Sequence, residues 1–238
     1  MTILADTIRE LVIANRILAR EGVVDAFGHV SIRHPENPER YLLSRSRAPE
    51  LIEPGDIMEF TLDGEAVDLR GRTPYGERMI HGAIYELRPE VQSVIHNHSC
   101  ELIPFSVTDA PLRPIMHTCA VIGSEIPRWD IRDKFGDTDH LVVTMEQGRD
   151  LAGSLAGNRA MLMRRHGSVV VGGNVKEAVM NAVYMQANAK MQMQAMQLGT
   201  PDFLNPAETE KCIARQMSPL AIDRAWEYWC IRAGSESL

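Results

Sequence analysis

The amino-acid sequence predicts an α/β fold, a three-layer α/β/α domain. Short apolar runs with the character of strands alternate with longer segments in which apolar residues recur at helical spacing. Glycine and proline separate these segments, which is typical of turns between elements. Short strands mixed with helices along one chain favour a layered α/β architecture. The chain has 238 residues, 45% of them hydrophobic, so it is long enough to bury a substantial core.

The first half of the chain begins with a helix and continues with strands. Residues 2–21 carry apolar side chains near helical spacing, and Gly22 is a typical C-terminal stop. The sequence over 62–65 predicts a hairpin turn, and Ser99 predicts the N-cap of a short helix through Phe105. The remaining expected elements are strands over 30–32, 41–43 and 57–61, a helix over 77–87 that stops before Pro89, and a strand that ends at His96.

The second half mixes strands with helices and ends in a helical tail. The segment 175–198 is rich in Met and Ala and predicts a long helix that packs in the core or between subunits. We expect a main domain over 1–200 and a helical extension over 201–238 that packs on the core or on a neighbouring subunit. The other expected elements are strands over 141–143 and 168–171, a strand that ends at His166, a helix over 146–155, and a tail helix with Trp226, Tyr228 and Trp229.

Composition excludes several classes of protein. The net charge is −7 without a basic cluster, so we expect no nucleic-acid partner. No apolar run reaches about 18 residues, which argues against a membrane span, and the charged N-terminal helix is unlike a secretory signal. Four widely spaced cysteines without a CxxC motif are expected to be reduced thiols, which favours a cytoplasmic protein.

Three histidines stand where strands are expected to end. His96 and His98 follow the β-branched pair Val94-Ile95, and residues i and i+2 of a strand point to the same side. His166 follows another apolar run and precedes a glycine. Three neutral imidazoles around one point hold a catalytic divalent metal with one coordination position open. We therefore predict that His96, His98 and His166 bind a metal, the alternative being that they are satisfied structural histidines.

Glu77 is the fourth candidate at this site. It lies just before an amphipathic segment and upstream of the histidine pair. A carboxylate at this place could complete the metal shell or act as an acid or base. The alternative is a carboxylate that only faces the positive end of the helix dipole. Spacing alone leaves these interpretations open.

The order of these motifs resembles the class II aldolase/adducin domain over about residues 5–198. The resemblance implies an α/β/α sandwich around a mostly antiparallel sheet, assembled as a homotetramer with active sites between subunits. It also implies that His96, His98 and His166 match the metal-binding histidines, and that Glu77 matches the glutamate that ligates the metal or moves protons. The residues that carry the resemblance are Glu77, Ile80-His81-Gly82-Ala83-Ile84-Tyr85, Arg88-Pro89-Glu90-Val91, Val94-Ile95-His96-Asn97-His98-Ser99 and Met163-Arg164-Arg165-His166-Gly167.

Departures from the family pattern concern the substrate. The sugar-phosphate aldolases of this family hold phosphate with small amide and hydroxyl donors. The corresponding positions here read Gly28-His29, Ser44-Arg45-Ser46 and Tyr75-Gly76, so an Arg and a His replace most of those donors and suit a planar carboxylate better. The segments 112–117, 122–123 and 126–132 resemble a branch of metal-dependent decarboxylases that act on 3,4-dihydroxyphthalate or 3-hydroxy-2-methylpyridine-4,5-dicarboxylate.

The resemblance therefore favours a non-oxidative decarboxylase with one divalent metal per subunit, Mn²⁺ or Zn²⁺, with Fe²⁺ as a further option. The metal would chelate a ring oxygen and the neighbouring carboxylate and stabilise negative charge as CO₂ leaves. Glu77 and His117 are the candidates to deliver a proton to the ring. Residues expected to bind a second carboxylate or line the substrate site are His29, Ser44, Arg45 and Arg78.

Three other functions are also compatible with the sequence. The same metal site could serve an aldolase or epimerase of a small sugar or sugar acid. Relatives with this fold include non-haem iron oxygenases of aromatic acids, which dioxygen dependence would reveal. Adducin-type domains use the fold for protein assembly, which an intact set of metal ligands disfavours. His29, Arg45 and His117 could each also have a purely structural role, and Arg78 could simply pair with Glu77.

Overall fold

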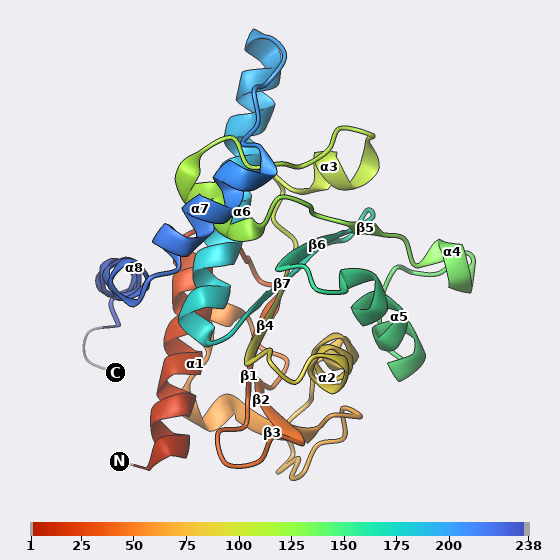
Figure 1. Cartoon of the computed structure of the whole chain (residues 1–238). Helices are drawn as coiled ribbons and strands as arrows, with labels where there is room; N and C mark the ends of the chain where they lie inside the picture. The colour runs from red at the N-terminus through yellow and green to blue at the C-terminus, as the bar shows by residue number, and fades with distance from the viewer. Residues whose placement is uncertain (1, 236–238) are drawn as a thin grey trace.

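The computed structural model describes residues 2–235 of the chain. Figure 1 shows a central sheet with α1, α6 and α8 on one side and α2 and α5 on the other. The predicted three-layer α/β/α architecture is confirmed. The mostly antiparallel sheet is confirmed as well, since β5 and β6 form the one parallel pair among the described strands.

The sheet has seven strands in the order β3-β2-β1-β4-β7-β6-β5. Its centre is β4, flanked by β1 and β7, so the strand that carries His96 has a hydrogen-bonded neighbour on both sides. The strands are β1 (His29–Arg33), β2 (Arg40–Ser44), β3 (Ile57–Thr61), β4 (Ser93–Asn97), β5 (Arg128–Trp129), β6 (Ala160–Met163) and β7 (Gly167–Gly172).

Helices form where the sequence provides both an apolar face and a cap. Thr2 caps the first helix by accepting a hydrogen bond from Ala5 N, and Asn174 caps α6 in the same way through Glu177 N. The helices are α1 (Ile3–Arg20), α2 (Arg78–Leu87), α3 (Ile103–Val107), α4 (Arg132–Phe135), α5 (Met145–Leu155), α6 (Val175–Leu198), α7 (Pro206–Gln216) and α8 (Pro219–Arg232). Short 3₁₀ turns are η1 (Pro49–Leu51), η2 (Pro54–Asp56) and η3 (His117–Ile122).

The two faces of the sheet bury separate hydrophobic clusters. In β7, Val169 and Val171 pack with α2 and α5, while Val170 packs with α1 and α6, because successive strand residues point to opposite faces. Every residue of β4 and β7 is buried, as expected for central strands covered on both faces. The polar side chains that these strands point toward α2 therefore need partners inside the protein.

The prediction of a strand over 141–143 is wrong, because this segment forms no strand in the structure. The backbone N–H of Val142 donates to the carboxylate of Glu77 at 3.0 Å, and that of Val143 donates to the side chain of Gln147 at 2.9 Å. Gln147 belongs to the capping box of α5, in which the Thr144 side chain accepts from its N–H. These amides serve a carboxylate and a helix cap, so they are not available to a sheet ladder.

Two further elements differ from the prediction. Ser99 does not cap a helix, because its hydroxyl donates to the Glu101 carboxylate at 3.1 Å and α3 begins only at Ile103. The helix α7 was missed, although Asn205 and Glu208 form a capping box around Pro206 at its start. The predicted helices over 2–21, 77–87, 146–155 and 175–198 and the strands around 30–32, 41–43, 57–61, 96 and 168–171 are confirmed within a few residues.

The tail beyond residue 200 packs on the rest of the chain. Ile222 and Trp229 of α8 are buried in the cluster formed with α1 and α6, and α7 lies against η3. The division into a domain over 1–200 and an extension over 201–238 stays a prediction. All four cysteines are free thiols. Among residues 2–235, no helix combines the length and apolarity that crossing a bilayer requires.

Candidate metal centre

Four side chains converge where the central strand β4 ends and β7 begins. Glu77, His96, His98 and His166 each offer a ligand atom, and these atoms lie within 4.8 Å of one another. Nε2 of His98 is 2.9 Å from Nε2 of His96 and 3.1 Å from Nε2 of His166. Oε2 of Glu77 is 3.6 Å and 3.5 Å from the same two nitrogens of His96 and His166. The structure thus brings together all four residues that the sequence nominated as metal ligands.

Strand register explains why residues seventy positions apart meet. β4 and β7 are antiparallel neighbours in which Asn97 pairs with Ser168, so the end of β4 lies beside the start of β7. His166 lies in the tight turn that joins β6 to β7, directly before that start. Arg165 has a positive φ of 61°, which turns the chain sharply enough to bring the ring of His166 over His98.

Gly167 allows the two strands to approach at this point. A Cβ atom at Gly167 would lie 2.0 Å from the carbonyl oxygen of Asn97 and 3.2 Å from Cα of His98. No side chain can occupy that space unless the strands separate. The glycine after His166 is therefore a packing requirement of the site.

The hydrogen bond of His96 leaves its Nε2 atom available to a metal. Nδ1 of the fully buried His96 donates to the carbonyl oxygen of Ser168 at 3.1 Å, which fixes the tautomer with a lone pair on Nε2. Nε2 of His98 lies within hydrogen-bond distance of Nε2 of both His96 and His166, so a cation at this place could be shared by the three nitrogens. Ligands of a tetrahedral zinc lie about 3.3 Å apart, given Zn–N distances of 2.0–2.1 Å. The observed separations bracket this value, so the donor set fits a divalent metal.

Burial and neighbouring groups shift the pKa values of His98 and Glu77. Burial, together with His96 and His166, lowers the pKa of His98 to about 4. Burial alone would raise the pKa of Glu77, but its histidine neighbours outweigh that effect and hold the pKa well below its usual range. Glu77 is thus an ionised carboxylate, the form in which it can bind a metal.

Glu77 is not a capping carboxylate. It occupies the N-cap position of α2, yet its side chain makes no capping hydrogen bond to the helix. Oε1 instead accepts from the Val142 backbone, and Oε2 faces the histidines. The reading of Glu77 as a helix-dipole carboxylate is therefore disfavoured, and the loop around Val142 orients the carboxylate toward the cluster.

His29 lies beside the cluster. Its ring centroid is 5.1 Å from that of His96, which is its direct cross-strand partner in β1 and β4. Nδ1 of His29 is 2.6 Å from Nε2 of His81, and burial with His81 and His96 lowers its pKa well below the ordinary value. His29 thus lies directly beside the four-residue cluster, and its predicted role in substrate binding stays a prediction.

Phe27 is a neighbour of the site that the sequence reading missed. Its side chain is 66% exposed, and its ring centroid lies 6.4 Å from that of His98. An exposed aromatic ring beside a candidate metal centre can stack on a planar ligand. The turn Asp25-Ala26-Phe27-Gly28 immediately before His29 is the sequence signal that could have identified it.

The predicted substrate-binding residues of the 44–46 and 73–78 segments lie side by side. Arg45 forms an isolated bridge with Pro74, three residues before Glu77. The guanidinium of Arg45 pairs with Asp56 at 2.5 Å. Ser44 is fully buried, and among residues 2–235 no hydrogen-bond partner is found for its hydroxyl. Arg78 donates to the carbonyl oxygens of Gly64 at 2.6 Å and Tyr75 at 3.0 Å, and no ion pair with Glu77 is found among the described residues.

His117 lies at the surface, as the first residue of η3. The segment before it is held to α6 by two buried amides, because Asn188 and Gln192 bond the backbone over 111–115 at 2.6–3.1 Å. Within residues 2–235 no contact joins His117 to the four-residue cluster. Its exposure excludes the core reading, whereas its predicted catalytic role stays a prediction.

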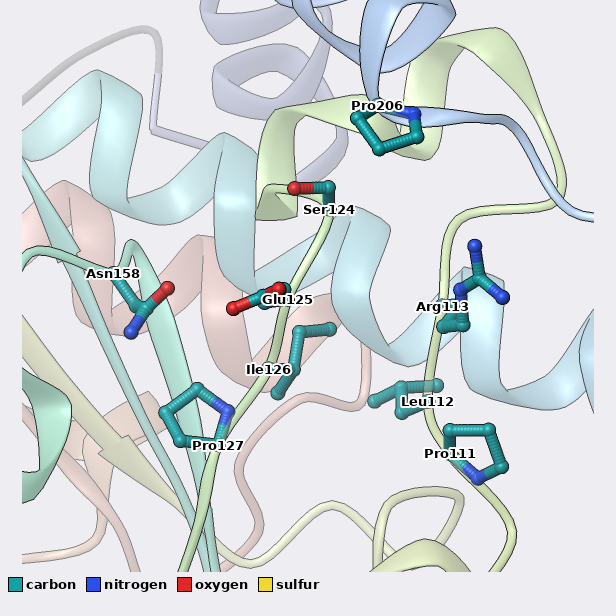
Figure 2. Close-up of a pocket in the computed structure, with 9 residues that line it drawn as sticks. All are labelled: Pro111, Leu112, Arg113, Ser124, Glu125, Ile126, Pro127, Asn158 and Pro206. Carbon is teal, nitrogen blue, oxygen red and sulfur yellow. The ribbon is translucent and has the colours of Figure 1, made fainter.

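A hollow on the surface of the isolated chain is separate from the cluster. Figure 2 shows its lining, with Arg113 and Glu125 on opposite walls. Arg113 lies over the ring of Phe203 at 4.7 Å. None of the predicted site residues lines this hollow, so it adds nothing to the metal centre.

A comparison with protein families settles the class. The profile of the Class II Aldolase and Adducin N-terminal domain matches residues 9–193. The chain belongs to the class II aldolase and adducin family. All four residues of the cluster fall inside the matched region, and the family assignment made from the sequence is confirmed.

Proteins similar to this chain include named decarboxylases and a named aldolase. Decarboxylase tropJ of Talaromyces stipitatus is 32% identical over 245 residues, which cover 93% of this chain and 92% of the relative. The 3,4-dihydroxyphthalate decarboxylase of a Terrabacter species is 29% identical over 206 residues, 82% of this chain and 83% of the relative. The L-fuculose 1-phosphate aldolase of Glaciozyma antarctica matches the fold with a TM-score of 0.78 at 24% identity, covering 98% and 92% of the two chains. The chain is an enzyme of this aldolase and decarboxylase group.

Proposed function

We propose that this protein is a divalent-metal-dependent, non-oxidative decarboxylase of a hydroxylated aromatic or pyridine carboxylate. The observation that carries the proposal is the intact cluster of three imidazoles and one ionised carboxylate, in a chain that is 32% identical to a named decarboxylase. The 3,4-dihydroxyphthalate decarboxylase of Terrabacter supports a substrate in which a ring hydroxyl stands next to a carboxylate.

The cluster would hold one metal per subunit through His96, His98, His166 and Glu77. Imidazole and carboxylate ligands suit Zn²⁺ or Mn²⁺, and Fe²⁺ is compatible with the same set. When bound, such a cation supplies the positive charge that stabilises an anionic ring after CO₂ leaves. Loss of CO₂ and aldol cleavage share this requirement, which explains how one fold serves both reactions.

The ring carbon must receive a proton after decarboxylation. The low pKa of Glu77 keeps this carboxylate ionised at neutral pH, so it is suited to be a ligand rather than a proton donor. His117 is the remaining candidate, and its exposed position suits a role in the active site of a neighbouring subunit. We infer a homotetramer with active sites between subunits, in which His117 completes the site of its neighbour.

A second carboxylate of the substrate would meet the positive and hydrogen-bonding side chains near Glu77. Arg45 reaches Asp56 with only part of its guanidinium, and its side chain is 37% exposed, so donors remain for a ligand. Ser44 and Arg78 frame the same region, and His29 lies between it and the metal cluster. This set replaces the small donors that hold phosphate in the sugar-phosphate aldolases.

An aldolase or epimerase acting on a small sugar acid is the competing function, because it needs the same metal ligands. An iron-dependent oxygenase of an aromatic acid is the third. An aromatic substrate is favoured over a sugar acid because Phe27 places an exposed aromatic ring beside the four-residue cluster, where a planar ring would stack. The decarboxylase is favoured over the oxygenase because the chain is 32% identical to a named decarboxylase over 93% of its length.

The test is anaerobic incubation of protein loaded with Zn²⁺ or Mn²⁺ with 3,4-dihydroxyphthalate and with its pyridine analogue. Stoichiometric release of CO₂ with one ring product, lost in His96→Ala, is the expected result. Turnover of a sugar acid without CO₂ would replace the proposal with the aldolase. Turnover only in the presence of dioxygen would replace it with the oxygenase.

A further inference from the structure

A chain of four buried polar side chains leads from the core to the metal cluster. Tyr85 hydroxyl lies 2.8 Å from Ser31 Oγ, Ser31 Oγ lies 2.6 Å from His81 Nδ1, and His81 Nε2 lies 2.6 Å from His29 Nδ1. His81 is fully buried, and Tyr85 and His29 retain 1% and 3% exposure. These groups are not needed to bind a metal, so their arrangement calls for another explanation.

The fold determines why these groups meet. His29 and Ser31 are residues i and i+2 of β1, so both point toward the same face of the sheet. His81 and Tyr85 lie four residues apart on α2, one turn above the other on the face that packs against that side. The strand and the helix therefore present alternate members of one continuous hydrogen-bond chain.

The hydrogen bonds from Tyr85 to His29 have a single consistent donor-to-acceptor direction. Among the described residues, the Tyr85 hydroxyl bonds no side chain other than Ser31, so its hydrogen must go there. Ser31 then has one hydrogen, which it donates to Nδ1 of His81. The proton of neutral His81 must consequently be on Nε2, from which it is donated to Nδ1 of His29. In the reverse direction the phenolic hydrogen of Tyr85 would be left in the core without an acceptor, which is costly.

The end of this chain faces the metal centre. With Nδ1 of His29 accepting from His81, the proton of His29 lies on Nε2, which has no partner within residues 2–235. The ring of His29 is next to His96 and to Tyr75, with centroid distances of 5.1 Å and 4.6 Å. We propose that Tyr85, Ser31 and His81 fix His29 in its Nε2–H tautomer, so that His29 donates a hydrogen bond to an anionic oxygen of the ligand bound at the cluster.

This role selects the chemical class of the ligand. A fixed N–H donor beside a metal binds a carboxylate or phenolate oxygen and leaves an ammonium or a donor hydroxyl unpaired. This hydrogen-bond chain holds a proton in place and does not conduct one. Moving a proton along it to His29 would leave a tyrosinate at Tyr85, and burial raises the pKa of Tyr85 well above its ordinary value. His81, Ser31 and Tyr85 are positioning residues, and of these four side chains only His29 touches the ligand. The anionic ligand rests on the proposed function, whereas the tautomer does not.

The first experiment measures the tautomer directly in metal-free protein. Long-range ¹H–¹⁵N correlation spectra of protein labelled with ¹⁵N-histidine distinguish Nε2–H from Nδ1–H rings, and His29→Gln identifies the signals of His29. We expect the Nε2–H form in the wild type and a mixture of tautomers in Ser31→Ala. An Nδ1–H ring at His29 in the wild type would overturn the proposal, whether or not the protein proves to be a decarboxylase.

The second experiment tests the donor with salicylate, which carries a phenol next to a carboxylate. The amide nitrogen of Gln can take the place of Nε2, whereas the shorter Asn reaches only the place of Nδ1, so the two variants form a matched pair. In zinc-loaded protein of unchanged metal content, we expect His29→Gln to bind salicylate within a few-fold of the wild type. We expect His29→Asn to bind about 10- to 100-fold more weakly, the range for a hydrogen bond to a charged group.

Tyr85→Phe separates positioning from packing. This variant keeps the ring and loses the hydroxyl that begins the chain, so we expect weaker salicylate binding and mixed His29 tautomers at unchanged zinc content. Equal salicylate affinity in wild type, His29→Asn and Tyr85→Phe would refute the donor role. Salicylate binding that follows the expected order without any release of CO₂ from the aromatic substrates would remove the decarboxylase proposal and leave this one standing.

Discussion

The backbone N–H of Val142 donates a hydrogen bond of 3.0 Å to Oε1 of Glu77, a residue 65 positions earlier in the chain. The other oxygen of Glu77 faces His96 and His166. One carboxylate therefore anchors the loop around Val142 and supplies the anionic group of the candidate metal site. These two functions can be separated by substitution.

Glu77→Gln and Glu77→Ala should have different effects on the loop around Val142 but similar effects on metal affinity. The glutamine keeps an oxygen for Val142 and places an uncharged amide at the cluster, whereas alanine removes both. We expect metal affinity, measured by competition with a chelating dye, to fall at least about 10- to 100-fold in each variant. Amide exchange at Val142 should accelerate in Glu77→Ala only. Equal acceleration in both variants would show that the loop depends on the charge.

His98→Ala should abolish stoichiometric metal binding, because His98 contributes the nitrogen that lies between those of His96 and His166. His117→Ala is the matched control, since it removes an exposed imidazole outside the cluster. Elemental analysis of purified protein should show one metal per chain in His117→Ala and less than a tenth of that in His98→Ala. Metal retained in His98→Ala would mean that the other three ligands suffice.

Acidification should destabilise the metal-free protein. Burial lowers the pKa of His98 to about 4 and that of His81 to about 3, whereas both titrate near 6.5 in the unfolded chain. Below about pH 6.5 the unfolded state binds more protons than the folded state, so the free energy of unfolding falls as the pH falls toward 4. The expected slope is about 1.4 kcal/mol per pH unit for each such histidine.

Chemical denaturation between pH 7.5 and 4.5 in the presence of a chelator measures this slope. His81→Gln provides the control, because it removes one of the titrating groups and should make the dependence shallower. A free energy of unfolding that stays constant over this range would contradict the assignment of neutral buried imidazoles.

Gly167→Ala should damage both stability and the metal site. The added Cβ would lie 2.0 Å from the carbonyl oxygen of Asn97, so β4 and β7 must separate next to His98. We expect a loss of about 1–3 kcal/mol in the free energy of unfolding, as for overpacked cores, together with weaker metal binding. Gly153→Ala in α5 has open space around its Cβ and should be neutral or stabilising. Thermal unfolding of both variants with and without zinc makes the comparison.

Local patterns in the sequence were sufficient to predict most elements. The helical spacing of 2–21 and 175–198 and the caps at their ends depend on neighbours within one or two turns, so they can be read without the fold. The pair His96 and His98 was predicted to share one side of a strand for the same reason. The strand over 141–143 failed because three apolar residues do not reveal that their amides bond Glu77 and Gln147.

The sequence alone determined the family, the layered architecture and the four residues that meet at the cluster. Only the tertiary structure decided what surrounds them: the anchoring of Glu77 by Val142, the exposed ring of Phe27, and the chain from Tyr85 through Ser31 and His81 to His29. Those contacts join residues fifty or more positions apart and depend on strand register and on how α2 lies across the sheet. The periodicity of apolar residues indicates which face of an element is buried, but it does not indicate which polar atoms meet there.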